Sequence, residues 1–105
     1  MTAETSRYVV MWEFKVRSGC EAAFLEAYAS NGVWARFFRR SPEFLGVELV
    51  QSVQHPSRYF TLDAWTSRAA FDEFREENAA SYATLDVKMA SLTEWERRIG
   101  AFPSE

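Results

Sequence analysis

Apolar residues recur at every second position near the start of the chain. From Tyr8 to Val16 every even position is apolar, and the charged residues Glu13 and Lys15 lie between them. A period of two is typical of a β-strand that buries one face. The pattern therefore predicts a strand over residues 8–16.

A helical pattern in two parts follows this strand. Ser18 and Glu21 have the spacing of a capping box, which predicts a helix start near Gly19. The apolar positions at helical spacing are Phe24, Leu25 and Tyr28, then Val33, Trp34, Phe37 and Phe38. The sequence Ser-Asn-Gly at 30–32 separates the two groups, and Pro42 stops the helix from continuing. We predict two helical pieces that end before this proline.

Two strands are predicted in the middle of the chain. Gly46 permits a turn after the helical pieces, and residues 47–54 then alternate between apolar and polar side chains. Residues 58–65 form an apolar run that ends at a tryptophan. The sequence His-Pro-Ser at 55–57 lies between them, so we expect a tight connection between neighbouring strands.

The last third of the chain returns to a helical period. Apolar side chains recur at helical steps over residues 71–92, with Asn78 as a polar member. This pattern predicts one long helix, which the hydroxyl of Thr66 or Ser67 would cap. A final strand is predicted over residues 95–102.

The predicted order of elements is βαββαβ within a single domain, residues 1–105, whose core spans about 7–102. This is the order of the ferredoxin-like fold, an α+β fold with an antiparallel four-stranded sheet. Because both helical parts lie on one face of such a sheet, the other face is bare. An uncovered face favours pairing with a second copy, so we expect a homodimer.

Aromatic residues make up 16% of the 105 residues, with four Trp, four Tyr and nine Phe. A small monomer cannot easily cover that much large apolar surface, so part of it is expected at an interface or in a pocket. The net charge is −3 and the basic residues are scattered. This distribution argues against nucleic acid and against a membrane surface as partners.

The chain has one Cys and one His. These counts exclude an internal disulfide, a histidine-based zinc site and most catalytic triads, and we predict no metal site. The start of the chain has no long apolar segment after basic residues, so neither a signal peptide nor a membrane span is predicted. We expect a cytoplasmic protein.

Three segments of the sequence resemble a known family. They are RYVVMWEFKVRSG near the start, FRRSPEFLGVEL after the first helical part and, above all, RYFTLDAWTSRAAFDEF. Together they make residues 7–102 similar to the antibiotic biosynthesis monooxygenase domain. The most recognisable piece is a strand that ends in Trp, followed by a short polar helix start and a later aromatic residue. The resemblance implies a dimeric α+β barrel.

The resemblance also implies a chemistry that can be compared position by position. Members that resemble the quinone-forming monooxygenases oxidise phenolic polyketides with O₂ and without a cofactor, because the reduced substrate supplies the electrons. Their pocket uses a Trp at the end of the third strand, an Asn four residues earlier and a Tyr six residues later. These positions are Trp65, Thr61 and Phe71 here. Threonine can donate a hydrogen bond to a developing oxyanion, whereas phenylalanine has no donor.

Haem-degrading members of the family carry an Asn on the first strand, a Trp on the second helix and an axial His ten residues later. By spacing, these positions are Trp12, Phe74 and Thr84, and none of them matches. The only histidine, His55, falls in the predicted turn between two strands. We therefore predict that the protein uses neither haem nor any other cofactor.

The candidate catalytic residues are Trp65, Thr61 and Asp63. Asp63 lies two positions before Trp65 and therefore on the same face of a regular strand. Its carboxylate is either a base for a phenol proton or the partner of Arg97 or Arg98 across a dimer, and we favour the salt link. Trp65 is either a packing wedge or a substrate contact, and we favour the wedge.

Aromatic side chains are the remaining candidates for a site. The candidate substrate-binding residues are Trp12, Phe14, Trp34, Phe71, Phe74 and Tyr82. Trp12 and Phe14 share a face of the first strand, where such a pair is either core or one wall of a site for a flat ligand. The leading hypothesis is cofactor-independent oxygenation of a small aromatic or polyketide phenol or quinol. The alternative is a non-catalytic dimeric barrel that binds small aromatic ligands or serves a stress role.

Overall fold

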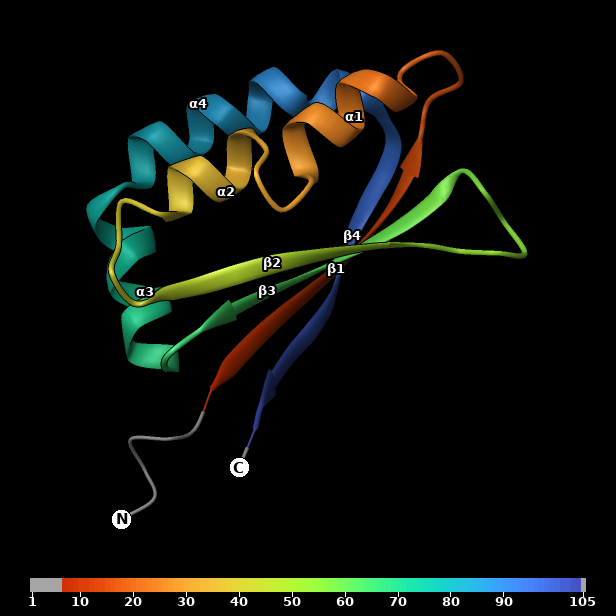
Figure 1. Ribbon diagram of the computed structural model, residues 1–105. Coiled ribbons are helices and arrows are strands. Elements are labelled where there is room, and N and C mark those ends of the chain that lie inside the picture. The colour runs from red at the N-terminus through yellow and green to blue at the C-terminus, as the bar shows by residue number, and fades with distance from the viewer. Residues whose placement is uncertain (1–6, 105) are drawn as a thin grey trace.

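Four strands form one layer of the fold, and the helices form a second layer on one face of the sheet (Figure 1). The structure is a computed structural model and describes residues 7–104; residues 1–6, on which part of the signal-peptide prediction rests, lie outside this range. The strands are β1 (Tyr8–Val16), β2 (Phe44–Gln51), β3 (Arg58–Trp65) and β4 (Thr93–Pro103). The helices are α1 (Glu21–Tyr28), α2 (Val33–Phe38), α3 (Arg68–Glu77) and α4 (Ala79–Met89), followed by the 3₁₀ turn η2 (Ala90–Leu92). The predicted ferredoxin-like α+β fold is confirmed.

The sheet is antiparallel, and its strands have the order β2-β3-β1-β4. Strand β1 pairs with β3 so that Trp12 is opposite Thr61 and Val10 is opposite Asp63. On its other side, β1 pairs with β4 and places Trp12 opposite Arg98. Residues directly opposite in a ladder share a face of the sheet. These side chains therefore point toward the same layer, the helices.

Three bulges, one in β2 and two in β4, change which side chains face the helices. In β2 the pairing passes from Phe44 to Gly46 and leaves Leu45 without an opposite residue. Gly46 has a φ of +143°, a conformation that residues with a side chain rarely adopt. In β4 the extra residues are Glu94 and Ile99. Even-numbered residues of β4 face the helices between the two bulges, and odd-numbered residues do so on either side of them.

The predicted strand ends agree with the structure for two strands and differ from it for the other two. The strands predicted over 8–16 and 58–65 are confirmed at both ends. Strand β2 begins and ends earlier than predicted, because the bulge lets Phe44 pair with Trp65. Strand β4 is longer than predicted at both ends, since β1 offers it a partner along its whole length.

The prediction of one long helix over residues 71–92 is wrong. Asn78, with a φ of −120°, separates α3 from α4, and its side-chain amide donates a hydrogen bond to the Phe74 carbonyl at 3.0 Å. Asparagine side chains compete in this way with the helical hydrogen bonds of the backbone. At the start of α3 the predicted cap is present, because the Ser67 hydroxyl accepts the Ala70 N–H at 3.1 Å.

The predicted capping box before α1 is incomplete. The helix begins at Glu21, after Cys20, whose side chain makes no capping hydrogen bond. The Glu21 carboxylate accepts a hydrogen bond from the Gly19 N–H at 2.9 Å. Within the described residues no bond from Ser18 completes the reciprocal pair. The predicted interruption between the two helical pieces is confirmed.

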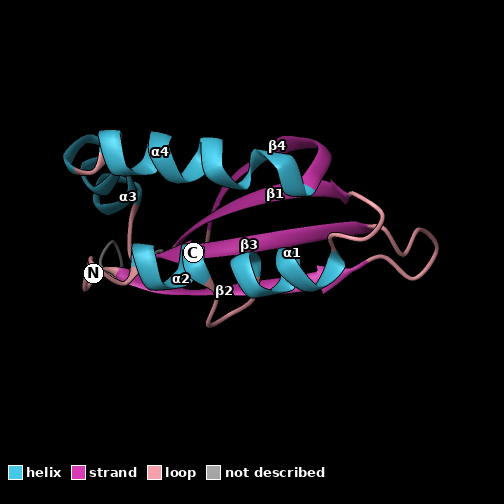
Figure 2. Ribbon diagram, turned by 90° about the horizontal axis from the view of Figure 1, so that it is seen from above, coloured by secondary structure: helices cyan, strands magenta, loops and turns pink. Residues whose placement is uncertain are grey.

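The core lies between the sheet and two rows of helices, α1 with α2 and α3 with α4 (Figure 2). Trp65, at the end of β3, is 0% exposed. The ring centroids nearest to its indole are those of Phe38 at 5.5 Å, Phe44 at 5.2 Å, Phe71 at 5.6 Å and Phe74 at 5.2 Å. The indole N–H is buried and has no hydrogen-bond partner among the described residues. Trp65 thus contributes apolar volume where the sheet, α2 and α3 meet.

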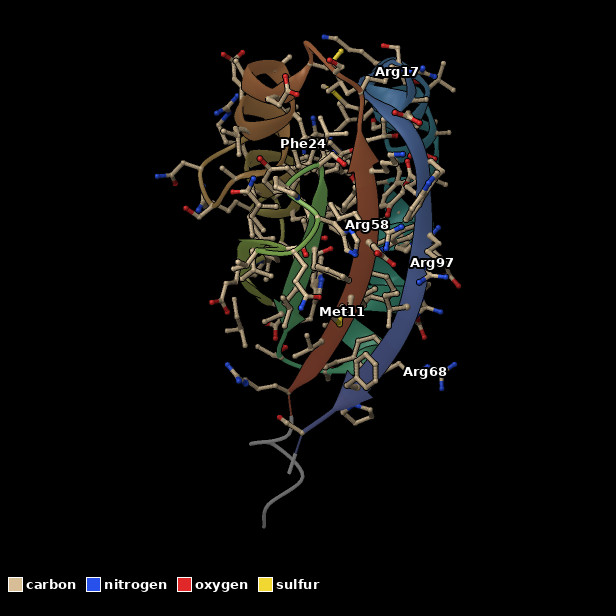
Figure 3. The ribbon with its side chains drawn as sticks, turned by 90° about the vertical axis from the view of Figure 1, so that its right-hand side faces the viewer. Met11, Arg17, Phe24, Arg58, Arg68 and Arg97 are labelled. Carbon is tan, nitrogen blue, oxygen red and sulfur yellow. The ribbon has the colours of Figure 1, made fainter. Side chains whose placement is uncertain are left out.

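The opposite face of the sheet carries no helix among the described residues (Figure 1). Met11 and Leu62 are opposite one another on this face, and Phe102 on β4 is 48% exposed. The face also holds one close ion pair, in which Arg97 Nη2 lies 2.7 Å from Glu13 Oε1. Figure 3 labels Met11 on β1 and Arg97 on β4. The face therefore combines apolar side chains with charged ones, among them Lys15 and Arg58, which are opposite one another on it.

The packing of Trp65 generates a stability prediction. Trp65→Ala should lower the free energy of unfolding by about 3–5 kcal/mol, because it empties a site between four aromatic rings. Trp65→Phe should cost less than half as much, since it keeps a ring and removes a buried N–H that has no acceptor. Urea unfolding followed by circular dichroism measures both. Val53→Ala, at a side chain 94% exposed, is the control and should change stability by less than about 0.5 kcal/mol. Equal losses in the two Trp65 variants would contradict the wedge.

Candidate functional site

A cavity of about 500 Å³ lies on the helix-covered side of the sheet. It is lined by strand residues from all four strands and by residues of α1, α2, α3 and α4, so it occupies the space between the two rows of helices seen in Figure 2. Its aromatic lining consists of Tyr8, Trp12, Phe14, Tyr28, Trp34, Phe38, Phe71 and Tyr82. Its charged lining consists of Asp63, Asp72, Asp86, Glu96, Arg68, Arg75 and Arg98. The size is that of a site for a small molecule.

The register of the central strand explains how the sheet builds the floor of this cavity. Even-numbered residues of β1 point toward the helices, and Trp12 and Phe14 lie there with ring centroids 6.4 Å apart and an angle of 23° between the rings. Thr61 lies opposite Trp12 on β3, and Glu96 lies opposite Phe14 on β4. Polar groups therefore flank a nearly parallel pair of aromatic rings.

Asp63 is half-buried in the cavity lining. No ion pair or side-chain hydrogen bond joins it to another described residue. Burial without a compensating charge disfavours the ionised form, and it raises the pKa of Asp63 to about 7. A carboxyl with such a pKa can accept or release a proton near neutral pH.

The favoured salt link of Asp63 is not present within the chain. Arg97 faces the other side of the sheet, where its Nε donates to Glu13 Oε1 at 2.8 Å. Arg98 does line the same cavity as Asp63, but the two form no ion pair. The alternation of β4 explains the position of Arg97 alone, because neighbouring residues of a strand point to opposite faces. A link across a dimer stays a prediction.

Thr61 lies two residues before Asp63 on β3 and therefore on the same face of the sheet. The residue is 4% exposed and lines the cavity, and its hydroxyl makes no hydrogen bond to another described residue. A hydroxyl in this position can donate to an oxygen of a bound molecule. Thr61 and Asp63 thus form one pair of polar groups in an otherwise aromatic floor.

A second set of polar side chains lines the cavity beside β4 and α4. Burial, and then the charge of Glu96, raise the pKa of Tyr28. Burial raises the pKa of Tyr82 to about 12, although the charge of Arg75 acts in the opposite direction. For Glu96, burial and then the nearby Asp86 raise the pKa. Both phenols therefore keep their protons at neutral pH, and Glu96 ionises less readily than an exposed carboxyl.

The structure brings most of the predicted site residues together. Thr61, Asp63, Trp12, Phe14, Trp34, Phe71 and Tyr82 all line the cavity. Trp65 and Phe74 do not line it but pack in the adjacent core. Glu96 lines the cavity and was missed as a candidate, and Arg98, considered only as a partner of Asp63 across a dimer, lines it too. Both are even-numbered residues of the last strand, and this shared parity could have placed them on one face. The catalytic and binding roles assigned to these residues stay predictions.

The described residues offer no group of three or more His, Cys, Asp and Glu side chains that could hold a metal ion. Among the same residues, no helix combines the length and apolar character needed to cross a membrane.

Solved structures with the same fold cover nearly the whole chain. Protein SO0527 from Shewanella oneidensis is 22% identical with a TM-score of 0.67, and the match covers 95% of this chain and 92% of that one. SnoaB, a cofactor-independent oxygenase from Streptomyces nogalater, is 18% identical with a TM-score of 0.69, over 95% and 94% of the two chains. PA3566 from Pseudomonas aeruginosa is 15% identical with a TM-score of 0.64, over 96% and 94%. At these identities the likeness establishes the fold alone.

At the level of sequence, no curated protein matches the chain. The sequence model of one family, however, matches the chain over residues 7–83. This range holds β1, β2, β3, α1, α2 and α3 and includes Thr61, Asp63 and all of the aromatic lining of the cavity. The resemblance expected from the sequence is confirmed, and the chain belongs to the antibiotic biosynthesis monooxygenase family.

Proposed function

We propose that the protein is a cofactor-independent monooxygenase that oxidises a small aromatic or polyketide phenol or quinol in the cytoplasm. The observation that carries the proposal is the unpaired, half-buried carboxylate of Asp63 in the floor of an aromatic cavity. Family membership supports it, as does the fold shared with SnoaB, which is described as a cofactor-independent oxygenase.

The cavity suits a flat aromatic ligand. Its aromatic walls provide apolar surface on several sides, and Trp12 and Phe14 present two rings inclined by only 23°. Offset stacking on such rings holds a planar molecule without fixing its rotation. Thr61 and Asp63 then supply the directional contacts, because a phenol hydroxyl can donate to the carboxylate while its oxygen accepts from the threonine.

The proposed reaction begins with proton transfer from the phenol to Asp63. The resulting phenolate is electron-rich, and Thr61 stabilises its oxygen by donating a hydrogen bond. The phenolate form reduces O₂, which adds to the ring carbon that is to be oxidised. One oxygen atom stays as the new carbonyl oxygen, and the other leaves as water with the hydrogen of that carbon and the phenol proton, which Asp63 returns. The four electrons that reduce O₂ come from the oxidation of the phenol to the quinone, so no further reductant is needed.

A second candidate function is that the same cavity binds an aromatic ligand without oxidising it. Thr61 and Phe71 stand where the quinone-forming enzymes hold an Asn and a Tyr, and Phe71 cannot donate a hydrogen bond. These two positions favour a dimeric protein that binds aromatic ligands or serves a stress role. Ligand binding without O₂ consumption would distinguish this function from catalysis.

The helix-free face of the sheet is proposed to bind a second copy of the chain. Leu62, Met11 and the exposed Phe102 give it an apolar surface next to the Glu13 and Arg97 ion pair. The resemblance to the family also implies a dimeric α+β barrel. Two such faces packed together would bury apolar area on both copies and would surround each ion pair with protein.

The first prediction concerns catalysis by Asp63. With anthrones and naphthohydroquinones as substrates, O₂ uptake corrected for the uncatalysed reaction should show kcat/KM rising with pH around 7, because the base must be ionised. Asp63→Asn should lower kcat/KM by about 10²–10⁴. Glu94→Gln, an exposed position outside the cavity lining, is the control for loss of one charge. Ligand binding with no O₂ uptake in the wild type would contradict the proposed oxygenase and favour the ligand-binding function.

The second prediction concerns the pH dependence of stability. The pKa of Asp63 is raised from 3.8 to about 7, so the folded protein binds this proton more tightly than the unfolded chain does. The associated stability is present below about pH 4 and is lost as the pH rises through 7. Asp63→Asn cannot ionise. Its stability relative to the wild type should therefore grow between pH 4.5 and pH 8 by about 1–3 kcal/mol in urea unfolding. A difference that does not change with pH would refute the raised pKa.

The third prediction concerns the dimer. Light scattering at micromolar concentration should give twice the mass of the chain, with an interface of about 1,200 Å² or more. Leu62→Glu should shift the mass toward the monomer, because it places a charge in the middle of the helix-free face. Val53→Glu, in an exposed loop, should leave the dimer intact. A monomeric wild type would disprove this assembly.

A further inference from the structure

A phenol lines the cavity on the side opposite its floor. Tyr82 belongs to α4, whereas Thr61 and Asp63 belong to the sheet. The helices form the second layer of the fold, so Tyr82 lines the cavity from its helix side (Figure 2). Its hydroxyl makes no hydrogen bond to another described residue, and protein atoms do not enclose its oxygen. A molecule bound between the sheet and the helices can therefore accept a hydrogen bond from Tyr82.

The ring of Tyr82 is held in place by its neighbours. Its centroid lies 5.1 Å from that of Trp34 and 6.2 Å from that of Phe38. The guanidinium of Arg75, on α3, lies 4.6 Å from the same centroid. These contacts fix the ring and leave its hydroxyl free. A group that is already positioned before the substrate binds is suited to act on it.

Tyr82 lies near Asp63 without being bonded to it. Burial raises the pKa of Tyr82 most, and the charge of Asp63 adds to this rise, so the two side chains are close. No hydrogen bond joins them. The carboxylates that act on Tyr28, the other phenol on the helix side, are instead Glu96 and Asp86. A carboxylate and a phenol therefore face the same part of the cavity from its floor and from its helix side.

The stacking of the ligand decides which face of its ring O₂ can reach. A ring stacked on Trp12 and Phe14 has one face covered by the floor of the cavity. Addition to a ring carbon takes place perpendicular to the ring, so O₂ would add to the face that is turned toward the helices. The peroxide formed there would lie on the side of Tyr82, away from the sheet.

We propose that Tyr82 is a catalytic acid and base that converts this peroxide into the product, an inference that rests on the proposed oxygenase. Tyr82 donates its proton to the terminal oxygen of the peroxide anion, which gives a ring hydroperoxide and a tyrosinate. The tyrosinate then takes the proton of the ring carbon. The electron pair of that C–H bond forms the carbonyl, and the O–O pair leaves with hydroxide.

The proton balance of this step closes without another reactant. The hydroxide takes the proton that Asp63 removed from the phenol and becomes water. Tyr82 has given one proton and taken one, and Asp63 is again a carboxylate. In net terms the two hydrogens of the water come from the ring carbon and from the phenol.

The surroundings of Tyr82 suit both halves of the step. Burial raises its pKa to about 12, so the phenol holds its proton at neutral pH until the peroxide forms. The charge of Arg75 acts on the pKa of Tyr82 in the opposite direction, because it stabilises the tyrosinate. A nearby cation thus makes a buried phenol a better proton donor.

Steady-state oxidation of anthrone and 1-naphthol tests the role of Tyr82. Tyr82→Phe should lower kcat for O₂ uptake by about 10²-fold or more, with KM changed less than about threefold, because only the chemical step loses its acid and base. Tyr59→Phe removes a phenol that is buried outside the cavity lining and should keep the kcat of the wild type. A loss of less than about threefold in Tyr82→Phe, or an equal loss in Tyr28→Phe, would overturn the role.

An isotope effect separates the chemical role from a packing role. In 4-deutero-1-naphthol the deuterium lies on the carbon that is oxidised to the second carbonyl of 1,4-naphthoquinone. Without Tyr82 as base, removal of this hydrogen should limit turnover, so the ratio of kcat for the light and heavy substrates should rise in Tyr82→Phe. Circular dichroism and the unfolding midpoint check that the variant is folded. A lower kcat with an unchanged ratio would assign Tyr82 to packing alone.

The failure of this role can be told apart from the failure of the oxygenase. O₂ uptake that depends on Asp63 and persists in Tyr82→Phe would remove the role of Tyr82 and leave the oxygenase. No O₂ uptake by the wild type with either substrate would remove both.

Discussion

The register between β1 and its two neighbours is the constraint on which the rest of the structure depends. Side chains alternate between the faces of a strand, so a slip of one residue would turn every side chain to the opposite layer. With the observed register, Trp12 lies between Thr61 and Arg98, and all three face the helices. The same register sends Glu13 to the other face, where Arg97 neutralises it. One pairing pattern therefore separates the residues of the cavity from those of the helix-free face.

The carboxylates on the two faces of the sheet differ in whether an arginine pairs with them. On the helix-free face the buried Glu13 has an arginine at 2.7 Å. On the cavity side, Asp63 and Glu96 have no ion pair among the described residues, and burial raises the pKa of both. Unpaired carboxylates reduce stability, so stability alone does not account for them. Both carboxylates line the cavity, where a bound molecule can reach them.

Local patterns in the sequence predict much of the fold, and they are wrong where a side chain competes with the backbone. The alternation of β1 and the apolar run of β3 predicted both strands at both ends. The helical period across Asn78 was misleading, because the periodicity of apolar side chains does not reveal that this amide bonds to the Phe74 carbonyl and ends α3. The bulge at Leu45 was equally hidden, since a bulge depends on the partner strand as well as on local sequence.

The sequence by itself determined the order of the elements, the aromatic character of the interior and the family, because each follows from periods and motifs along the chain. It also pointed to Thr61, Asp63 and most of the aromatic side chains that line the cavity. Only the tertiary structure decided that Trp65 lies in the core beside the cavity, and that Glu96 meets Tyr28 and groups from α4. The physical reason is that burial and charge proximity arise between elements far apart in the chain, and periodicity along one element carries no information about them.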